Sequence, residues 1–189
     1  MHKLRKLNLA FALTLTALAT ATVSAQETEY EDHVLSDGKL SVEELSLLVR
    51  QAQEDLKALT EASIAQVRGE LEATGVFEPN AWMLMKDGEL KKIQPGEDAQ
   101  GAPGDIKVLM YRASLKSIAR HGRIDAGLVA YPGTVEIDGQ KQRVVAVEHE
   151  HRLGVSGIKL IPVSLTSGNA EFKAALSQDK SFEIFYDGK

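Results

Sequence analysis

IDAGLVAYPGTVEIDGQKQRVVAVEHEH, the stretch from Ile124 to His151, contains two apolar-rich runs joined by Asp138-Gly139. An Asp-Gly pair readily adopts the positive φ angles that a two-residue type I′ hairpin turn requires. Runs rich in Val and Ile on both sides of such a turn are typical of antiparallel strands. The stretch therefore predicts a long hairpin with strands over Ile124–Ile137 and Gln140–His151.

Charged residues support one register for this hairpin. A two-residue turn places Glu136 opposite Lys141 and Asp125 opposite Arg152. Opposite charges that face each other across antiparallel strands are favourable, whereas like charges are not. Pro132 cannot donate a hydrogen bond to a neighbouring strand, so we expect an edge or a bulge at that point.

The sequence after the hairpin predicts a third strand. Residues 155–165 form another apolar run, in which Pro162 indicates exposure on one side. Ser167-Gly168-Asn169 is typical of a turn. Residues 170–176 fit either a short helix or a strand, and residues 182–186 are apolar enough to dock on the domain.

A shorter hairpin and a helix precede the long hairpin. Residues 81–93 flank Asp87-Gly88, for which we expect a second two-residue type I′ turn. Gly and Pro residues between 94 and 103 predict a surface loop. Asp105 can cap a mostly apolar helix that ends at His121-Gly122.

A long amphipathic helix is predicted upstream. Ser41 and Glu44 form a capping box, and Gly75 is suited to the position after the last turn. Ser63 is a polar residue on the otherwise apolar face of this helix, so a break of the helix near Thr60 is possible, but one long helix is simpler. The apolar residues recur in steps of three and four, as one helix face requires, at Val42, Leu45, Leu48, Val49, Ala52, Leu56 and Leu59.

These elements define an α+β fold class. The expected architecture is an antiparallel sheet of about five strands with the long N-terminal helix and the second helix packed on it, in the order α-β-β-α-β-β-β. This element order resembles the profilin-like and roadblock-type sandwiches, in which helices cover both faces of a sheet. The resemblance lies in element order alone, and it implies no particular function because such folds have many roles.

The N-terminal residues are typical of a secretory signal peptide. Lys3, Arg5 and Lys6 precede a short apolar stretch that ends in the small-x-small pattern Val23-Ser24-Ala25. That stretch is shorter than the roughly 20 apolar residues of a membrane-spanning helix. We therefore predict a signal peptide over 1–25, an acidic flexible tail over 26–40 and a single domain over 41–189, with a periplasmic or secreted location.

The net charge and the absence of cysteine exclude several classes of binding partner and of chemistry. The whole chain has a net charge of −5, and cleavage of a segment with three basic and no acidic residues would make it −8. Such a surface repels nucleic acid and anionic lipid, so we expect neither nucleic-acid binding nor membrane insertion after cleavage. The absence of cysteine excludes disulfides, thiol catalysis and cysteine-based zinc sites.

One set of residues could bind a metal ion. His149 and His151 are two positions apart on a predicted strand, so both imidazoles point to the same face. His121 closes the preceding helix and could supply the third ligand of a zinc site. The ordinary alternative is that His149, Glu150 and His151 belong to the fraying polar end of a hairpin, and that His121 favours the negative end of a helix dipole.

Other chemistry has weaker support. Glu148 and Glu150 would share a strand face, where crowding could raise one pKa, but the chain has 27 acidic residues and such neighbours arise by chance. Trp82, Met83 and Met85 could line a pocket with Phe77 and Pro79 at its rim, although core filling explains them more simply.

No nucleophile motif or phosphate-binding loop is present, and no catalytic residue is assigned. The first hypothesis is therefore a non-enzymatic exported binding or regulatory module that contacts a protein, a peptide or a small ligand. Addition of a peptide to a sheet edge near Pro132 or Pro162 would be one mode. The alternative is a metal-binding protein or metal-dependent hydrolase that uses the His149 and His151 pair.

Overall fold

The computed structural model describes residues 39–186, so the predicted signal peptide and almost all of the predicted tail lie outside the described residues. The α+β fold is confirmed, with the predicted element order extended by two short strands and one 3₁₀ turn. The elements are α1 (Val42–Thr74), β1 (Asn80–Met85), β2 (Leu90–Lys92), η1 (Glu97–Ala99), α2 (Gly104–Arg120), β3 (Ile124–Ile137), β4 (Gln140–His151), β5 (Val155–Thr166), β6 (Asn169–Phe172) and β7 (Leu176–Gln178).

The strands form one antiparallel sheet in the order β2-β1-β3-β4-β5-β6, with β7 also paired to β5. The predicted long hairpin is confirmed together with its register, because Ile137 faces Gln140. Asp138 and Gly139 have φ angles of 51° and 74°, as a type I′ turn requires. At the other end, Arg152 Nη1 lies 3.0 Å from Asp125 Oδ1.

The β1–β2 turn differs from the prediction. Met85 N donates to Glu89 O and Gly88 N donates to Met85 O, so the loop has three residues rather than two. Only Gly88 takes a positive φ, of 83°, while Asp87 does not. This is the three-residue hairpin with a left-handed glycine, which an Asp-Gly pair also suits.

The two prolines of the sheet occupy different settings. The pairing of β1 with β3 begins at Asn80, opposite Ala130, so Pro132 lies where β3 pairs with β4 alone and its missing N–H leaves no ladder bond unmade. The expected open edge near Pro162 is wrong, because β6 and β7 pair with β5 on either side of Pro162. Lys173 N donates to Pro162 O there.

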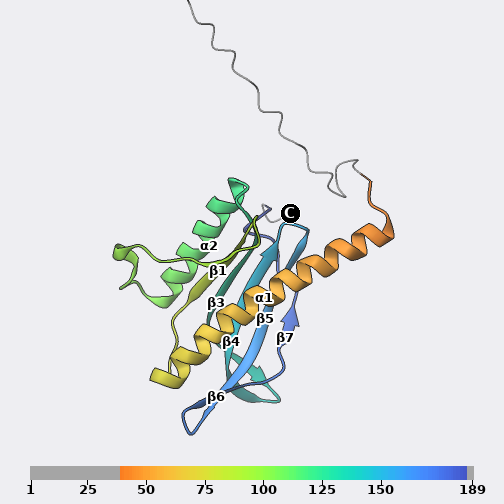
Figure 1. Ribbon diagram of the computed structural model, residues 1–189. Helices are drawn as coiled ribbons and strands as arrows, with labels where there is room; N and C mark the ends of the chain where they lie inside the picture. Colours follow the sequence, from red (N-terminus) through yellow and green to blue (C-terminus); the bar gives the residue numbers. More distant parts are fainter. Residues whose placement is uncertain (1–38, 187–189) are drawn as a thin grey trace, which may run out of the picture. The chain divides into compact units, whose positions relative to one another are not determined.

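Helix α1 is unbroken and lies across one face of the sheet (Figure 1). Its predicted capping box is present, with Ser41 N donating to Glu44 and Glu44 N donating to Ser41 Oγ. The polar residue in its stripe, Ser63, is fully buried and donates to Asn80 Oδ1 at 2.8 Å. The first turns of α1 extend past the strands, so Val42 and Leu45 are exposed (Figure 1).

Helix α2 packs on the opposite face of the sheet. It begins at Gly104 after Pro103, so Asp105 lies in the first turn and is not the N-cap that we predicted. Gly127 on β3 lets this helix come close, because a Cβ at that position would lie 3.0 Å from a methyl of Leu115. Within residues 39–186, no helix is both long and apolar enough to cross a membrane.

Two apolar cores result, one on each face. The core under α1 joins the helix to β1, β3, β4 and β5 through Leu56, Leu59, Val67, Leu71, Leu84, Leu128, Val145, Val147 and Ile161, among others. The core under α2 is smaller and consists mainly of Ala81, Val108, Tyr111, Leu115, Ile124, Val129 and Ile184. Ile184 belongs to the C-terminal segment (residues 179–186), which docks as predicted.

Candidate functional site

The four polar residues at the end of β4 are buried, so their interpretation as a fraying strand end was wrong. Glu148, His149, Glu150 and His151 have exposed fractions between 0% and 8%. Successive side chains on a strand point to opposite faces. His151 contacts α1 through Asp55, whereas Glu148 contacts Arg112 on α2. The run therefore sends its imidazoles to one face and its carboxylates to the other.

The hydrogen bonds of His151 fix its protonation state. Leu153 N donates to Nδ1 at 3.1 Å, so Nδ1 carries no proton, and Nε2 lies 3.1 Å from Asp55 Oδ2. The ring is thus neutral, with its proton on Nε2 donated to Asp55. Burial lowers the pKa of His151, which outweighs the opposing effect of Asp55.

His149 lies on the same face as His151, as predicted. Burial, followed by the positive charge of Lys159, lowers its pKa. Its ring lies over Gly157, where a Cβ would come within 3.2 Å of Nε2. Glycine at that position leaves the space that the imidazole fills.

His121 does not join the other two histidines. It lies at the end of α2, which covers the opposite face of the sheet, and its Nδ1 is 2.7 Å from Ser117 O. Both ring nitrogens of His151 already have protein partners. Across residues 39–186, no group of three or more His, Asp or Glu side chains is placed to hold a metal ion. The predicted three-histidine zinc site is therefore not assembled in this part of the chain.

Glu150 holds the C-terminal segment. Its carboxylate is fully buried and accepts from the backbone N–H groups of Glu183, Ile184 and Phe185, at 2.7 to 3.2 Å. The ammonium of Lys180 also donates to it, at 3.1 Å. A buried carboxylate needs such donors, because without them its desolvation is costly. Glu150 therefore has a structural role.

Glu148 belongs to a second network, with Arg112 and Tyr131. Arg112 donates from Nε at 2.9 Å and from Nη2 at 2.5 Å, in a two-point pairing, and the Tyr131 hydroxyl donates at 2.6 Å. Burial acts to raise the pKa of Glu148, but the bonds from Arg112 and Tyr131 outweigh it and lower the pKa overall. Burial, together with the bond to Glu148, raises the pKa of Tyr131 to about 12.

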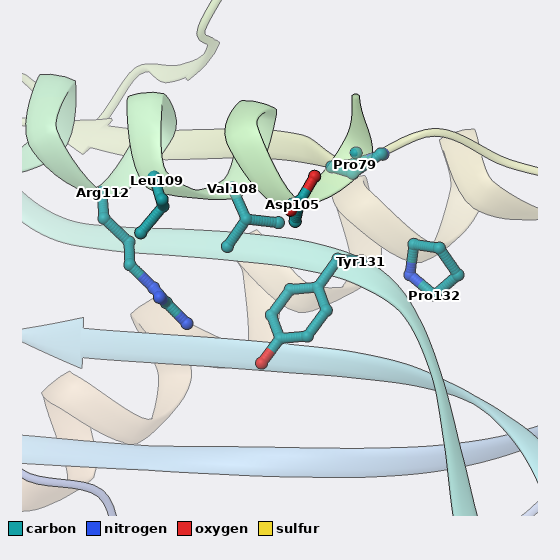
Figure 2. A pocket seen from close by; sticks show the side chains of 8 residues that line it. Pro79, Asp105, Val108, Leu109, Arg112, Tyr131 and Pro132 are labelled. Carbon is teal, nitrogen blue, oxygen red and sulfur yellow. The ribbon is translucent and has the colours of Figure 1, made fainter. Parts of the chain in front are cut away.

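A cavity of about 400 Å³ lies between the beginning of α2 and β3, and Arg112 and Tyr131 line it (Figure 2). Figure 2 shows their polar ends pointing toward one another from α2 and from β3. The other walls are Pro79, Gly104, Asp105, Val108, Leu109 and Pro132. The cavity thus combines mostly apolar walls with the Arg112 and Tyr131 side chains, which already pair with Glu148, and with the Asp105 carboxylate.

Most residues that we considered for a pocket lie elsewhere. Trp82 packs against the core under α1, and Met83 and Met85 pack against the core under α2, so the simpler interpretation as core residues is confirmed. Phe77 is also a core residue, whereas Pro79 does line the cavity.

Sequence reasoning missed Arg112 and Tyr131. One signal was available: Glu148 and Glu150 follow Val144 and Ala146 on the same face of β4. Carboxylates on a face that is otherwise buried need cationic partners. Arg112, which lies in a mostly apolar helix, was a candidate for that role. Comparison with known proteins adds no further guide, since no family model, curated protein or solved structure matches this chain.

Proposed function

We propose that this protein is an exported, non-enzymatic binding module that holds a small, mostly apolar ligand in the cavity between α2 and β3. The observation that carries the proposal is the cavity, whose volume of about 400 Å³ and apolar walls fit the usual range for small-molecule sites. The signal-like residues 1–25 support a periplasmic or secreted location.

The polar residues of the site favour binding over catalysis. A general acid or base works best when its pKa lies near the operating pH. The pKa of Glu148 is lowered and that of Tyr131 is raised to about 12, so both move away from neutrality. Both groups also donate or accept within their own network with Arg112. This arrangement supports a site that positions a ligand.

The proposal is tested with an uncharged fluorescent probe, N-phenyl-1-naphthylamine. We expect saturable binding by the wild-type protein, and a loss of at least about tenfold in affinity for Leu109→Asp, because this change adds a charge to the cavity wall. Ile106→Asp is the matched control. It makes the same change at another exposed position of α2 that does not line the cavity.

Equal loss of affinity in the two variants, or no saturable binding by the wild type, would contradict the proposal. The exposed apolar residues in the first turns of α1 could bind the same probe at a separate place. Leu45→Asp in that region measures this background, and we expect it to leave the saturable component unchanged.

A further inference from the structure

The hydrogen-bonding groups of the cavity restrict the ligand, if the proposed function holds. A guanidinium has five N–H donors. Arg112 uses Nε and Nη2 on Glu148, and within residues 39–186 its Nη1 has no hydrogen-bond partner. Both oxygens of Glu148 already accept, and the Tyr131 proton is given to one of them. The Arg112–Glu148–Tyr131 network therefore has spare donors for a ligand, and both carboxylate oxygens are occupied.

Charge balance restricts the ligand further. The positive charge of Arg112 is matched by Glu148 at 2.5 Å, and Glu183 Oε2 lies 3.9 Å from its Nε. Asp105 also places a carboxylate in the lining of the cavity. An anionic ligand would meet an arginine whose charge is already neutralised, with further negative charges nearby, and would gain little from it.

A cationic ligand is also disfavoured at this network. It would have to approach the guanidinium, and the Glu148 oxygens that could attract it are taken by Arg112 and Tyr131. Asp105 could attract a cation, but its place in the first turn of α2 is seven residues from Arg112, about 10 Å along the helix axis. An uncharged acceptor, such as a carbonyl oxygen, can accept from the free N–H groups of Arg112, and it has no charge for the guanidinium or the carboxylates to repel.

We propose that the ligand is an uncharged amphiphile, with an apolar ring or short chain against Val108, Leu109 and the two prolines, and a carbonyl-type oxygen bound by Arg112 Nη1. Amides, ketones and esters of this size belong to that class. Tyr131 and Glu148 hold the guanidinium in place and act as positioning residues.

The test uses three compounds with one common body: 4-phenylbutanamide, 4-phenylbutanoate and 4-phenylbutylamine. Each is titrated against the protein loaded with N-phenyl-1-naphthylamine at pH 7. We expect the amide to displace the probe about tenfold more tightly than the acid or the amine. If the acid or the amine binds as tightly as the amide, the inference is wrong while the binding function stands.

Glu148→Gln sharpens the test, because it removes the neutralising charge with little change of shape. With Arg112 uncompensated, we expect the ratio of acid to amide affinity to rise by about tenfold. Glu183→Gln is the matched control, and it should change the ratio less than about threefold because Glu183 is half exposed and farther from the guanidinium. An unchanged ratio in folded Glu148→Gln would overturn the inference.

The outcomes separate the two proposals. Absence of saturable probe binding by the wild type defeats the binding function itself, and the inference with it. Saturable probe binding with the wrong order of the three compounds defeats only the inference. The wild-type order decides this even if Glu148→Gln does not fold, which circular dichroism would reveal.

Discussion

The two faces of the sheet accommodate their polar residues differently, although the same stretch of β4 supplies both sets. On the α1 face, the imidazole of His151 is neutral and is paired to Asp55 and to the Leu153 N–H. On the α2 face, Glu148 and Glu150 are carboxylates that rely on Arg112, Lys180 and backbone donors. On the α1 face the imidazole of His151 pairs with a single carboxylate, whereas on the α2 face two buried carboxylates require several donors.

The cavity follows from the second arrangement. Helix α1 is 33 residues long and contacts β1, β3, β4, β5 and β6, while α2 has 17 residues and contacts mainly β1 and β3. Arg112 reaches from α2 toward β4, and its stem and partners take the place of apolar packing there. The larger apolar core therefore lies under α1, whereas the cavity lies on the α2 face.

The largest expected effect is at Glu150. We expect Glu150→Ala to lower the free energy of unfolding by about 3–5 kcal/mol, because it leaves three backbone donors without their acceptor and takes one carboxylate partner from the partly buried ammonium of Lys180. Urea denaturation measures this loss. The matched control is Glu183→Ala, which removes a half-exposed carboxylate of the same network and should cost less than about 1 kcal/mol.

Leu59→Ala tests whether packing on the α1 face can be weakened without a change in ligand binding on the α2 face. Leu59 is fully buried under α1, and its truncation should lower the free energy of unfolding by about 3 kcal/mol. Because it lies on the face away from the cavity, probe affinity should stay within about twofold of wild type. A large loss of affinity in folded Leu59→Ala would show that the two faces are not separable.

Tyr131→Phe removes one hydroxyl from the cavity network. We expect a loss of about 1.5–2 kcal/mol in the free energy of unfolding from urea denaturation, since the hydrogen bond joins a half-buried hydroxyl to a carboxylate. Loss of that donor should also raise the pKa of Glu148, which carbon-detected NMR of its carboxylate would follow. A pKa unchanged from wild type would contradict the geometry of the network.

The smallest expected effect is on the pH dependence of stability, which differs between the two faces of the sheet. The folded pKa values of His149 and His151 lie below 6.5, so the unfolded chain binds more protons and stability falls as pH drops below about 6.5. The pKa of Glu148 lies below 4.5, so its contribution is present above that pH and is lost as pH falls through the folded pKa.

Denaturation between pH 8 and pH 4 measures both contributions. The double variant His149→Gln/His151→Gln should flatten the dependence just below pH 6.5. Glu148→Gln should keep that slope and reduce the loss below pH 4.5. If the free energy of unfolding of the histidine double variant depended on pH in the same way as that of the wild type, the assignment of neutral imidazoles would be wrong.

The long hairpin could be predicted from the sequence because its determinants are local. Asp138-Gly139 sets the turn, and the Glu136–Lys141 and Asp125–Arg152 pairs agree with the register it gives. The burial of the β4 end could not be predicted in this way. It depends on Asp55 and Lys180, which lie 96 and 30 residues away in the chain from their partners.

The cavity was missed for a related reason. It depends on where α2 begins relative to β3, and this start is set by Pro103 and by the approach of Leu115 to Gly127, contacts that no periodic pattern reveals. Charged residues in a sequence are most often exposed, so an alternation of Glu and His resembles a strand leaving the core. Only partners from distant elements reverse that interpretation.

The attachment of residues 180–185 to Glu150 has a practical consequence for recombinant work. A shortened chain ending at Asp179 would remove from Glu150 the ammonium and all three amide donors together. Trimming this region to aid crystallisation would therefore destabilise the domain, and affinity tags are better joined ahead of Ser41.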